Sequence, residues 1–280
     1  MTVLVTGVRG RVGSLVAAEL AAHGIRVRGG SSHVGGVERA ASAHLGVPTV
    51  AVDLRTATGL EAALDGVDRV FLYAAADAIE EVTRAFVAAG VAHVVVLSSA
   101  SVEMAGGGAL GRHHEQVEQS VVAAGLGWTF LRPNAFATNT LRWADGVRAG
   151  RVALPFPDAY VEPIHEADLA DAAVAALTDE RHLGRSYYLT GGVSMTQRQQ
   201  IATIAAAVGH EVVVEELDPQ EWRRQLLRRG TLDSVADALI SLWSQTLDGP
   251  GRHDGRITDV TGAEPRTYAQ WVADHGADFR

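Results

Sequence analysis

Short apolar runs rich in β-branched residues alternate with amphipathic stretches through the first half of the chain. The runs are TVLVT (2–6), IRVRG (25–29), PTVAVD (48–53), DRVFLYA (68–74), HVVVLSS (93–99) and GWTFLRP (127–133). Their apolar character on both faces predicts strands of a parallel sheet that is buried on both sides. The stretches between them predict helices over residues 11–23, 35–45, 57–64, 76–89 and 110–124. This order is typical of an α/β fold with a doubly wound parallel sheet.

The alternation loosens after about residue 134, where four prolines interrupt it at 133, 155, 157 and 163. The later pattern predicts helices over 166–178, 196–208, 219–229 and 232–247, and short strands over 186–190 and 211–217. We therefore expect a Rossmann domain over residues 1–150 that binds a dinucleotide. Residues 151–280 are expected to form a smaller α+β substrate lobe, which packs on the sheet edge and does not fold independently.

Composition narrows the possible functions. The formal net charge of −9 argues against a dedicated nucleic-acid binder. No apolar stretch reaches the roughly 20 residues of a bilayer span, and no signal peptide is visible, so we expect a cytoplasmic protein without a membrane partner. The chain has no Cys, and all 24 of its basic residues other than His are Arg. Thiol nucleophiles, thiolate zinc sites and lysine chemistry are thereby excluded.

Three glycines stand between the first predicted strand and the first predicted helix, at positions 7, 10 and 13. Gly7 permits a tight turn, Gly10 lets a diphosphate approach the backbone, and Gly13 allows the helix to pack close to the sheet. The free amides at the start of that helix favour an anion. Arg9, Arg11 and Val12 are therefore expected to join the glycines in cofactor contacts.

The end of the second predicted strand bears on the choice of cofactor. NAD-binding proteins usually carry an acidic residue there, whereas this chain has Ser31, Ser32 and His33 and no acid before Glu38. The two serines and the histidine could donate to a 2′-phosphate, and Arg9 and Arg28 could add positive charge. The sequence thus favours NADP(H) over NAD(H).

Two residues that follow the third predicted strand, Asp53 and Leu54, are expected near the adenine. Asp53 could accept a hydrogen bond from the adenine amino group, or it could serve only in a turn or helix cap.

In its motifs the chain resembles the NmrA-like, atypical short-chain dehydrogenase/reductases, which include NAD(P)H-dependent quinone reductases. The matching stretches are TGVRGRVG, LDGVDRVFL, HVVVLSSAS, HHEQVEQSVVAAGLGWTFLRPNAFATN, IHEADLADAAVAAL, YYLTGG and DVTGAEPRTYAQWVADH, and they extend over nearly the whole chain. The resemblance implies a nicotinamide cofactor that lies across the carboxyl ends of the strands. It implies cofactor contacts by Tyr73, Ala74, Ser98, Ser99, Pro133, Asn134 and Phe136. Family members often carry an Arg where this chain has Ser32, so more of the charge would have to come from Arg9.

Standard short-chain dehydrogenases use a Tyr-x-x-x-Lys pair, in which the Lys lowers the pKa of the Tyr. Counting from Glu118, these positions hold Leu110 and His114 here. Ordinary alcohol–ketone chemistry is therefore not expected. A hydride can still be transferred if a nicotinamide is held against a carbon that is already electrophilic, as in a quinone, an enone or an imine.

Three residues are the candidate catalytic residues: Ser99 as a hydrogen-bond donor, His114 as an acid, and Tyr73 as a wall of the same crevice. His113 is a weaker candidate acid, and His165 is expected to be structural. No metal site is expected, because His114 and Glu118 at i,i+4 lack a third ligand.

Other polar and aromatic positions allow two interpretations. Asn134 and Asn139 could orient a substrate or cap helices, and Phe136 and Trp143 could stack on a flat substrate or belong to the core.

Three functions remain open at this point. The first is an NAD(P)H-dependent reductase of an electrophilic small molecule. The second is a non-enzymatic sensor of the cofactor, and the third is a redox-neutral cyclase or isomerase. The expected partner is a small-molecule substrate, and a homo-oligomer is possible.

Overall fold

The structure is a computed structural model that describes residues 1–32, 46–74, 77–104, 108–250 and 257–280. His33 and the helix expected at 35–45 lie outside the described residues. Parallel strands form the central sheet, in the order β3-β2-β1-β4-β5-β6-β9. The strands are β1 (Thr2–Thr6), β2 (Arg26–Ser31), β3 (Thr49–Ala51), β4 (Arg69–Tyr73), β5 (His93–Leu97), β6 (Gly127–Pro133) and β9 (Arg185–Leu189). The predicted doubly wound parallel sheet is thereby confirmed.

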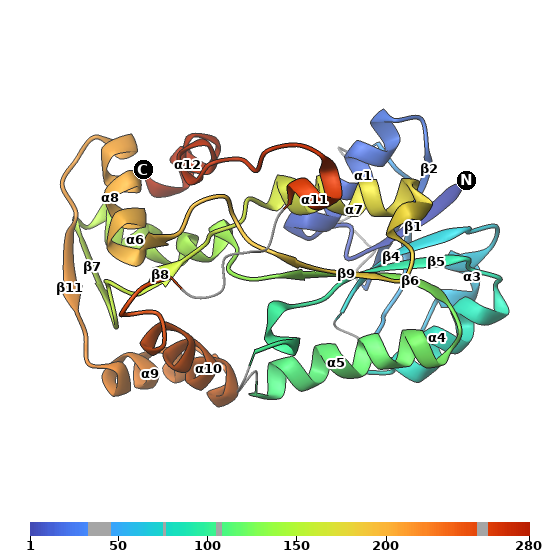
Figure 1. Ribbon diagram of the computed structural model, residues 1–280, viewed down its shortest axis with the longest axis horizontal. Coiled ribbons are helices and arrows are strands. Elements are labelled where there is room, and N and C mark those ends of the chain that lie inside the picture. Colours follow the sequence, from blue (N-terminus) through green and yellow to red (C-terminus); the bar gives the residue numbers. More distant parts are fainter. Residues whose placement is uncertain (33–45, 75–76, 105–107, 251–256) are drawn as a thin grey trace.

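Helices cover both faces of this sheet (Figure 1). On one face lie α1 (Arg11–Ala22) and α7 (Glu166–Thr178), and on the other lie α3 (Leu60–Leu64), α4 (Ile79–Ala88) and α5 (Gly108–Ala123). Alternate residues of β1 show how one strand serves both layers. Val3 and Val5 pack with α1 and α7, whereas Leu4 packs with α3 and α4. This two-sided burial explains why the strands are continuous apolar runs.

The strand order reverses direction between β1 and β4, the place where doubly wound sheets open a crevice for a ligand. The hydroxyl of Thr6 joins the two strands there. It donates a hydrogen bond to the carbonyl of Phe71 (2.9 Å) and accepts one from the N–H of Tyr73 (2.8 Å). The carboxyl ends of β1 and β4 are thus fixed relative to each other.

A second, smaller part of the molecule lies beyond the carboxyl edge of the sheet (Figure 1). Its strands are the parallel pair β7 (Arg151–Leu154) and β11 (Val213–Glu216) and the antiparallel pair β8 (Tyr160–Val161) and β10 (Met195–Thr196). Its helices include α6 (Ala144–Arg148), α8 (Gln197–Val208), α9 (Pro219–Arg228), α10 (Asp233–Ser244) and α12 (Tyr268–His275). Two short 3₁₀ helices, η2 (Ala137–Trp143) and η4 (Gly276–Phe279), also belong to this part, whereas η1 (Ala100–Val102) follows β5 and η3 (Glu180–His182) precedes β9. We call this part the lobe.

Two elements that follow residue 150 belong to the central sheet and its helical cover. Strand β9 pairs with β6, and α7 packs against α1. The domain boundary expected at residue 150 therefore does not separate all of the sheet from the lobe. Whether the lobe can fold alone stays a prediction.

The C-terminal segment, which includes α11 (Thr258–Thr261) and α12, is held against α7 by buried polar contacts. The buried carboxylate of Asp168 accepts hydrogen bonds from the backbone N–H (2.9 Å) and the guanidinium (2.5 Å) of Arg266. Glu166 accepts one from the indole N–H of Trp271 (2.9 Å). These contacts tie the lobe to the sheet's helical layer. None of the described helices is long and apolar enough to cross a bilayer.

His93, at the start of β5, generates a testable pH dependence of stability. Its Nε2 lies 2.9 Å from Thr129 Oγ1, whose own proton is donated to the carbonyl of His182 (2.7 Å). Thr129 therefore accepts from a neutral imidazole. Burial, with a contribution from the positive charge of Arg69, lowers the pKa of His93 to about 4. Because this pKa is below the unfolded value of about 6.5, the contribution to stability is complete above pH 6.5 and is lost as the pH falls towards 4.

We expect the free energy of unfolding to fall by about 2–3 kcal/mol between pH 7 and pH 4.5 on account of this one group. The variant His93→Gln should lack that part of the slope, as measured by urea unfolding at the two pH values. His23→Gln, at an exposed helix end, is the matched control and should keep the slope. An unaltered slope in His93→Gln would contradict the assignment.

Candidate active site

Two of the cavities along the carboxyl edge of the sheet share Tyr73. The loop cavity, of about 380 Å³, adjoins the glycine turn after β1. The lobe cavity, of about 340 Å³, lies between the sheet edge and the lobe. Tyr73, at the end of β4, lines both of them and leaves about half of its surface exposed. A ligand longer than either cavity could thus extend from one to the other past Tyr73.

The glycine turn has the backbone geometry that a diphosphate needs. Gly7 has a φ of +62°, and its carbonyl accepts a hydrogen bond from the N–H of Gly10 (2.7 Å). A Cβ at Gly13 would lie 2.3 Å from the carbonyl oxygen of Gly7, so only glycine allows this approach of α1 to the strand. Gly10 is the N-cap of α1 and supplies no side chain to occupy the helix amides. The first turn, which begins with Arg11 and Val12, also contains no acidic residue.

The loop cavity is lined by Gly7 and Gly10, expected at the diphosphate, and by residues expected around the adenosine end: Arg9, Ser31, Ser32, Asp53 and Leu54. Arg55, which the sequence analysis missed, lines it as well and pairs with Asp53 through its guanidinium (3.1 and 3.2 Å). Arg28 is not in this cavity. Its guanidinium donates to the carbonyls of Ala63 and Asp65 (2.7 and 2.8 Å) beside α3.

The serines after β5 have different environments, although both line the lobe cavity. The hydroxyl of Ser98 donates to the buried carboxylate of Glu118 (2.5 Å), which also pairs with Arg132 of β6. The Oγ of Ser99 accepts from the N–H (3.2 Å) and the hydroxyl (2.8 Å) of Ser101. Since both of these contacts are accepted, Ser99 keeps its own proton to donate to a ligand.

His114 and Leu110 on α5 also line the lobe cavity, at the positions of the missing Tyr-Lys pair. The Nδ1 atom of His114 is buried and has no hydrogen-bond partner among the described residues. Burial and the neighbouring His113 lower the pKa of His114 to about 4, so its imidazole is neutral at pH 7. A protonated His114 acting as an acid at neutral pH is therefore disfavoured, and a hydrogen-bonding role remains.

His113 does not line this cavity and instead contacts Ala74, the residue that follows β4. Its Nε2 lies 2.8 Å from the carbonyl oxygen of Ala74, which can only accept, so the imidazole donates. Ala74 is itself buried and does not line either cavity.

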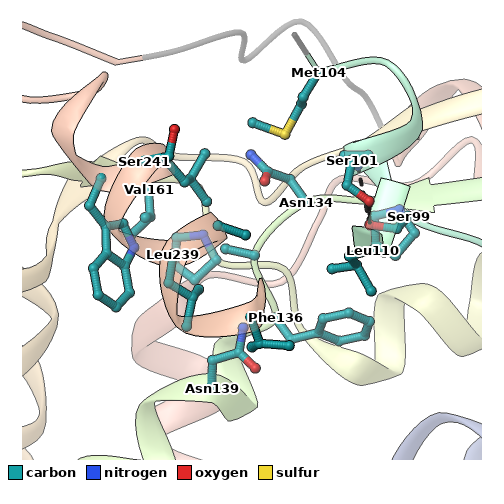
Figure 2. Close-up of a pocket in the computed structure, with 18 of the residues that line it drawn as sticks. Ser99, Ser101, Met104, Leu110, Asn134, Phe136, Asn139, Val161, Leu239 and Ser241 are labelled. Atoms are coloured by element: carbon teal, nitrogen blue, oxygen red, sulfur yellow. Dashed lines mark hydrogen bonds between the residues drawn. The ribbon is translucent and has the colours of Figure 1, made fainter. Parts of the chain in front are cut away.

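The end of β6 brings Pro133, Asn134 and Phe136 to the lobe cavity. Figure 2 shows Asn134 and Phe136 there, and their contact with a cofactor stays a prediction. Trp143 and Asn139 line it too. His165, by contrast, is buried and caps α7, with its Nδ1 accepting from the N–H of Ala167 (3.1 Å). The structure thus gathers the three candidate catalytic residues, Tyr73, Ser99 and His114, in one cavity.

The lobe contributes a wall that the sequence analysis did not identify. The helix α10 supplies its apolar residues, and η2 and α8 supply polar ones: Val235, Ala238, Leu239, Leu242, Trp243, Arg142, Gln197 and Gln200. The apolar spacing in α10 is typical of any packed helix, so no local signal marked it as a cavity wall. Within the described ranges, no cluster of three or more His, Asp or Glu side chains could hold a metal ion.

Comparisons with known proteins agree with this geometry. Residues 7–180 match a family model described as NAD(P)H-binding. A Streptomyces griseus (4-alkanoyl-5-oxo-2,5-dihydrofuran-3-yl)methyl phosphate reductase is 35% identical over 284 residues, covering 99% of each chain. An NAD(P)H azoreductase of Xenophilus azovorans is 31% identical over 243 residues, covering 84% of each chain.

Solved structures share the fold. An NADPH-dependent quinone oxidoreductase from Escherichia coli superposes with a TM-score of 0.80 at 23% identity, covering 98% of this chain and 99% of that one. A triphenylmethane reductase from Citrobacter sp. in complex with NADP(H) gives a TM-score of 0.79 at 20% identity, with 98% and 99% covered. The matched segment, the two relatives and the glycine turn together show that this chain belongs to the NAD(P)H-binding oxidoreductases of the NmrA-like, atypical short-chain dehydrogenase/reductase family.

Proposed function

We propose that this protein transfers a hydride from NADPH, in preference to NADH, to an electrophilic carbon of a conjugated small molecule, such as a quinone, an enone or an imine. The observation that carries the proposal is the lobe cavity itself. It is mostly apolar, it meets the loop cavity at Tyr73, and none of the described residues lining it is an Asp, a Glu or a Lys. Such a site supports hydride transfer by positioning rather than by strong acid catalysis.

The relatives support this choice of acceptor. The dihydrofuranone that names the Streptomyces relative has a carbon–carbon double bond conjugated with two carbonyl groups. An azo group and a quinone, which name other relatives, are likewise electrophilic before any protonation. An acceptor of this kind needs no Tyr-Lys pair, because the negative charge that forms is delocalised onto oxygen or nitrogen.

Different residues bind the cofactor and stabilise the charge that develops on the acceptor. The amides of α1 and the glycine turn hold the diphosphate, and the bound nicotinamide supplies the hydride. Ser99 donates a hydrogen bond, while keeping its proton, to the carbonyl oxygen of the acceptor, where negative charge develops as the π electrons of the double bond shift towards that oxygen. His114 lines the same cavity, and in the neutral tautomer that carries its proton on the unpartnered Nδ1 it can donate a second hydrogen bond. Water then protonates the reduced product, since His114 is neutral at pH 7.

The preference for NADPH rests on the charge of the loop cavity. Arg9 and Arg55 line it beside the hydroxyls of Ser31 and Ser32, which suits a 2′-phosphate. Asp53 is paired with Arg55 and therefore does not present a free carboxylate that would repel that phosphate.

Turnover provides the primary test. Stopped-flow absorbance should show oxidation of NADPH in the presence of at least one member of a panel of quinones, cyclic enones and imines. The variant Ser99→Ala should lower kcat about 10-fold, because a hydrogen bond to developing charge is lost. Ser120→Ala, on α5 but outside both cavities, serves as the control. No turnover with any member of the panel would overturn the proposal.

The glycine turn can be tested by cofactor binding alone. In Gly13→Ala the added Cβ would lie 2.3 Å from the carbonyl oxygen of Gly7 and must displace the start of α1. We expect the Kd for NADPH to rise at least ~10-fold in calorimetry, since the diphosphate contacts depend on that position. Gly276→Ala, where φ is −57° and a Cβ would meet only the flexible end of Arg280 at 3.8 Å, is the matched control. An equal Kd in the two variants would show that the turn does not hold the diphosphate.

Selectivity between the two cofactors is expected to depend on Arg9. Arg9→Ala should lower kcat/KM for NADPH about 10-fold while changing kcat/KM for NADH much less, because only NADPH carries the 2′-phosphate. Initial rates with each cofactor at a fixed acceptor concentration give this ratio. Equal losses with both cofactors would place Arg9 against the shared diphosphate instead.

A further inference from the structure

One cation faces the lobe cavity without a counter-charge. Arg142, near the end of η2, is exposed where it lines this cavity. The rest of the described lining contains no acidic side chain, and no described carboxylate forms an ion pair with Arg142. The chain as a whole carries a formal charge of −9, so a lone guanidinium in this wall is a local feature rather than a general surplus of positive charge.

Arg142 is held in place by neutral partners. Its guanidinium carbon lies 5.3 Å from the ring centre of Trp143 and 4.9 Å from that of Trp243 on α10. One of its nitrogens lies 3.5 Å from Oε1 of Gln197. The amide of Gln197 is oriented in turn, because its Nε2 donates to the carbonyls of Pro155 (3.2 Å) and Phe156 (3.0 Å). The charge is thus positioned but not neutralised.

The surroundings of Arg142 disfavour its charged form to a limited extent, because its side chain stays partly exposed. Desolvation by the neighbouring protein atoms lowers the pKa of Arg142 to about 10. Aromatic rings compensate only part of the lost hydration. An anionic ligand would supply the remainder.

Gln200, one turn further along α8 than Gln197, provides an independent observation. It lines the same cavity, it is 2% exposed, and its Nε2 has no hydrogen-bond partner among the described residues. A buried amide donor without an acceptor is rare in native proteins, and its cost is removed when a ligand accepts from it. A cation and an unsatisfied donor therefore line the lobe side of one cavity.

We propose that Arg142 and Gln200 form a subsite for an anionic oxygen group of the substrate, either a carboxylate or a phosphate ester. This inference rests on the proposed function, since it names the class of acceptor that the reductase takes. Figure 2 shows Ser99 and Ser101 on one side of the cavity and Leu239 and Ser241 of α10 on the other. Arg142 lies against Trp243 of the same helix, so the anionic group is held at the α10 side while the electrophilic carbon lies near Ser99.

A pair of acceptors that differ in one anionic group tests the subsite. We would compare 1,4-naphthoquinone with 1,4-naphthoquinone-2-sulfonate in the wild-type enzyme, in Arg142→Met and in Gln200→Leu. The ratio of kcat/KM for the sulfonate to that for the neutral quinone should fall at least ~10-fold in Arg142→Met, through KM more than through kcat. Gln200→Leu should lower it about 3-fold or more, and Arg142→Lys should restore part of the ratio. Arg84→Met, which removes an exposed arginine of α4, should not alter it.

Small anions distinguish the two kinds of group. Methyl phosphate and acetate are tested as competitive inhibitors of neutral quinone reduction, and the stronger of the two identifies the shape of the anion. Inhibition by either one should weaken in Arg142→Met. A ratio unchanged in Arg142→Met, or a KM for NADPH that rises as much as that for the sulfonate, would overturn the proposal.

A binding measurement separates this inference from the hydride-transfer proposal. Quenching of tryptophan fluorescence by 1,4-naphthoquinone-2-sulfonate in the NADP⁺-loaded protein reports binding next to Trp143 and Trp243 whether or not turnover occurs. Tight quenching in the wild type that weakens at least ~10-fold in Arg142→Met supports the subsite, even if no quinone is reduced. Equal affinity in the two proteins contradicts it, even if both reduce quinones.

Discussion

The approach of Gly13 to the carbonyl oxygen of Gly7 is the constraint on which the rest of the site depends. It places the start of α1 directly over the end of β1, so the helix amides face the crevice where the strand order reverses. The hydroxyl of Thr6 fixes the end of β4 against the same point. Because both contacts involve backbone atoms of neighbouring elements, the position of Tyr73, between the two cavities, follows from them.

The sheet edge and the lobe contribute different things to the lobe cavity. The sheet edge provides residues that end strands or follow them, such as Ser99 and Asn134, and their placement is rigid because the strands are buried on both faces. The lobe provides residues from η2, α8 and α10, which are joined by short strand pairs rather than by a continuous sheet. Under the proposed function, the sheet edge would position the cofactor and the lobe would recognise the substrate.

Features of this arrangement that short segments of sequence encode were predictable, and features that arise only from tertiary packing were not. The glycine turn, the strands β1, β4, β5 and β6 and their terminal residues were predictable, since apolar runs and glycine spacing are properties of short segments. Strands β8 and β10 have two residues each, too few for any periodicity, and they went unrecognised. Arg142 and Gln200 are 58 positions apart and come to the same cavity only through tertiary packing, so no local pattern connects them. The pKa of His114 also depends on burial and on His113. The prediction of His114 as an acid used the ordinary pKa near neutrality, which the folded protein lowers.

The anchoring of the C-terminal segment on α7 has a consequence for how the molecule assembles as it is made. The hydrophobic core of the lobe combines residues from η2 and β7 with Trp271, Val272 and Phe279, which come more than a hundred positions later. The nucleotide-binding turn needs only residues from the first strands, and it can form while much of the chain has not yet been synthesised. The core of the lobe is completed only when residue 279 has been synthesised. The residues that line the loop cavity thus come early in the chain, whereas the lobe that closes the other cavity depends on its last helices.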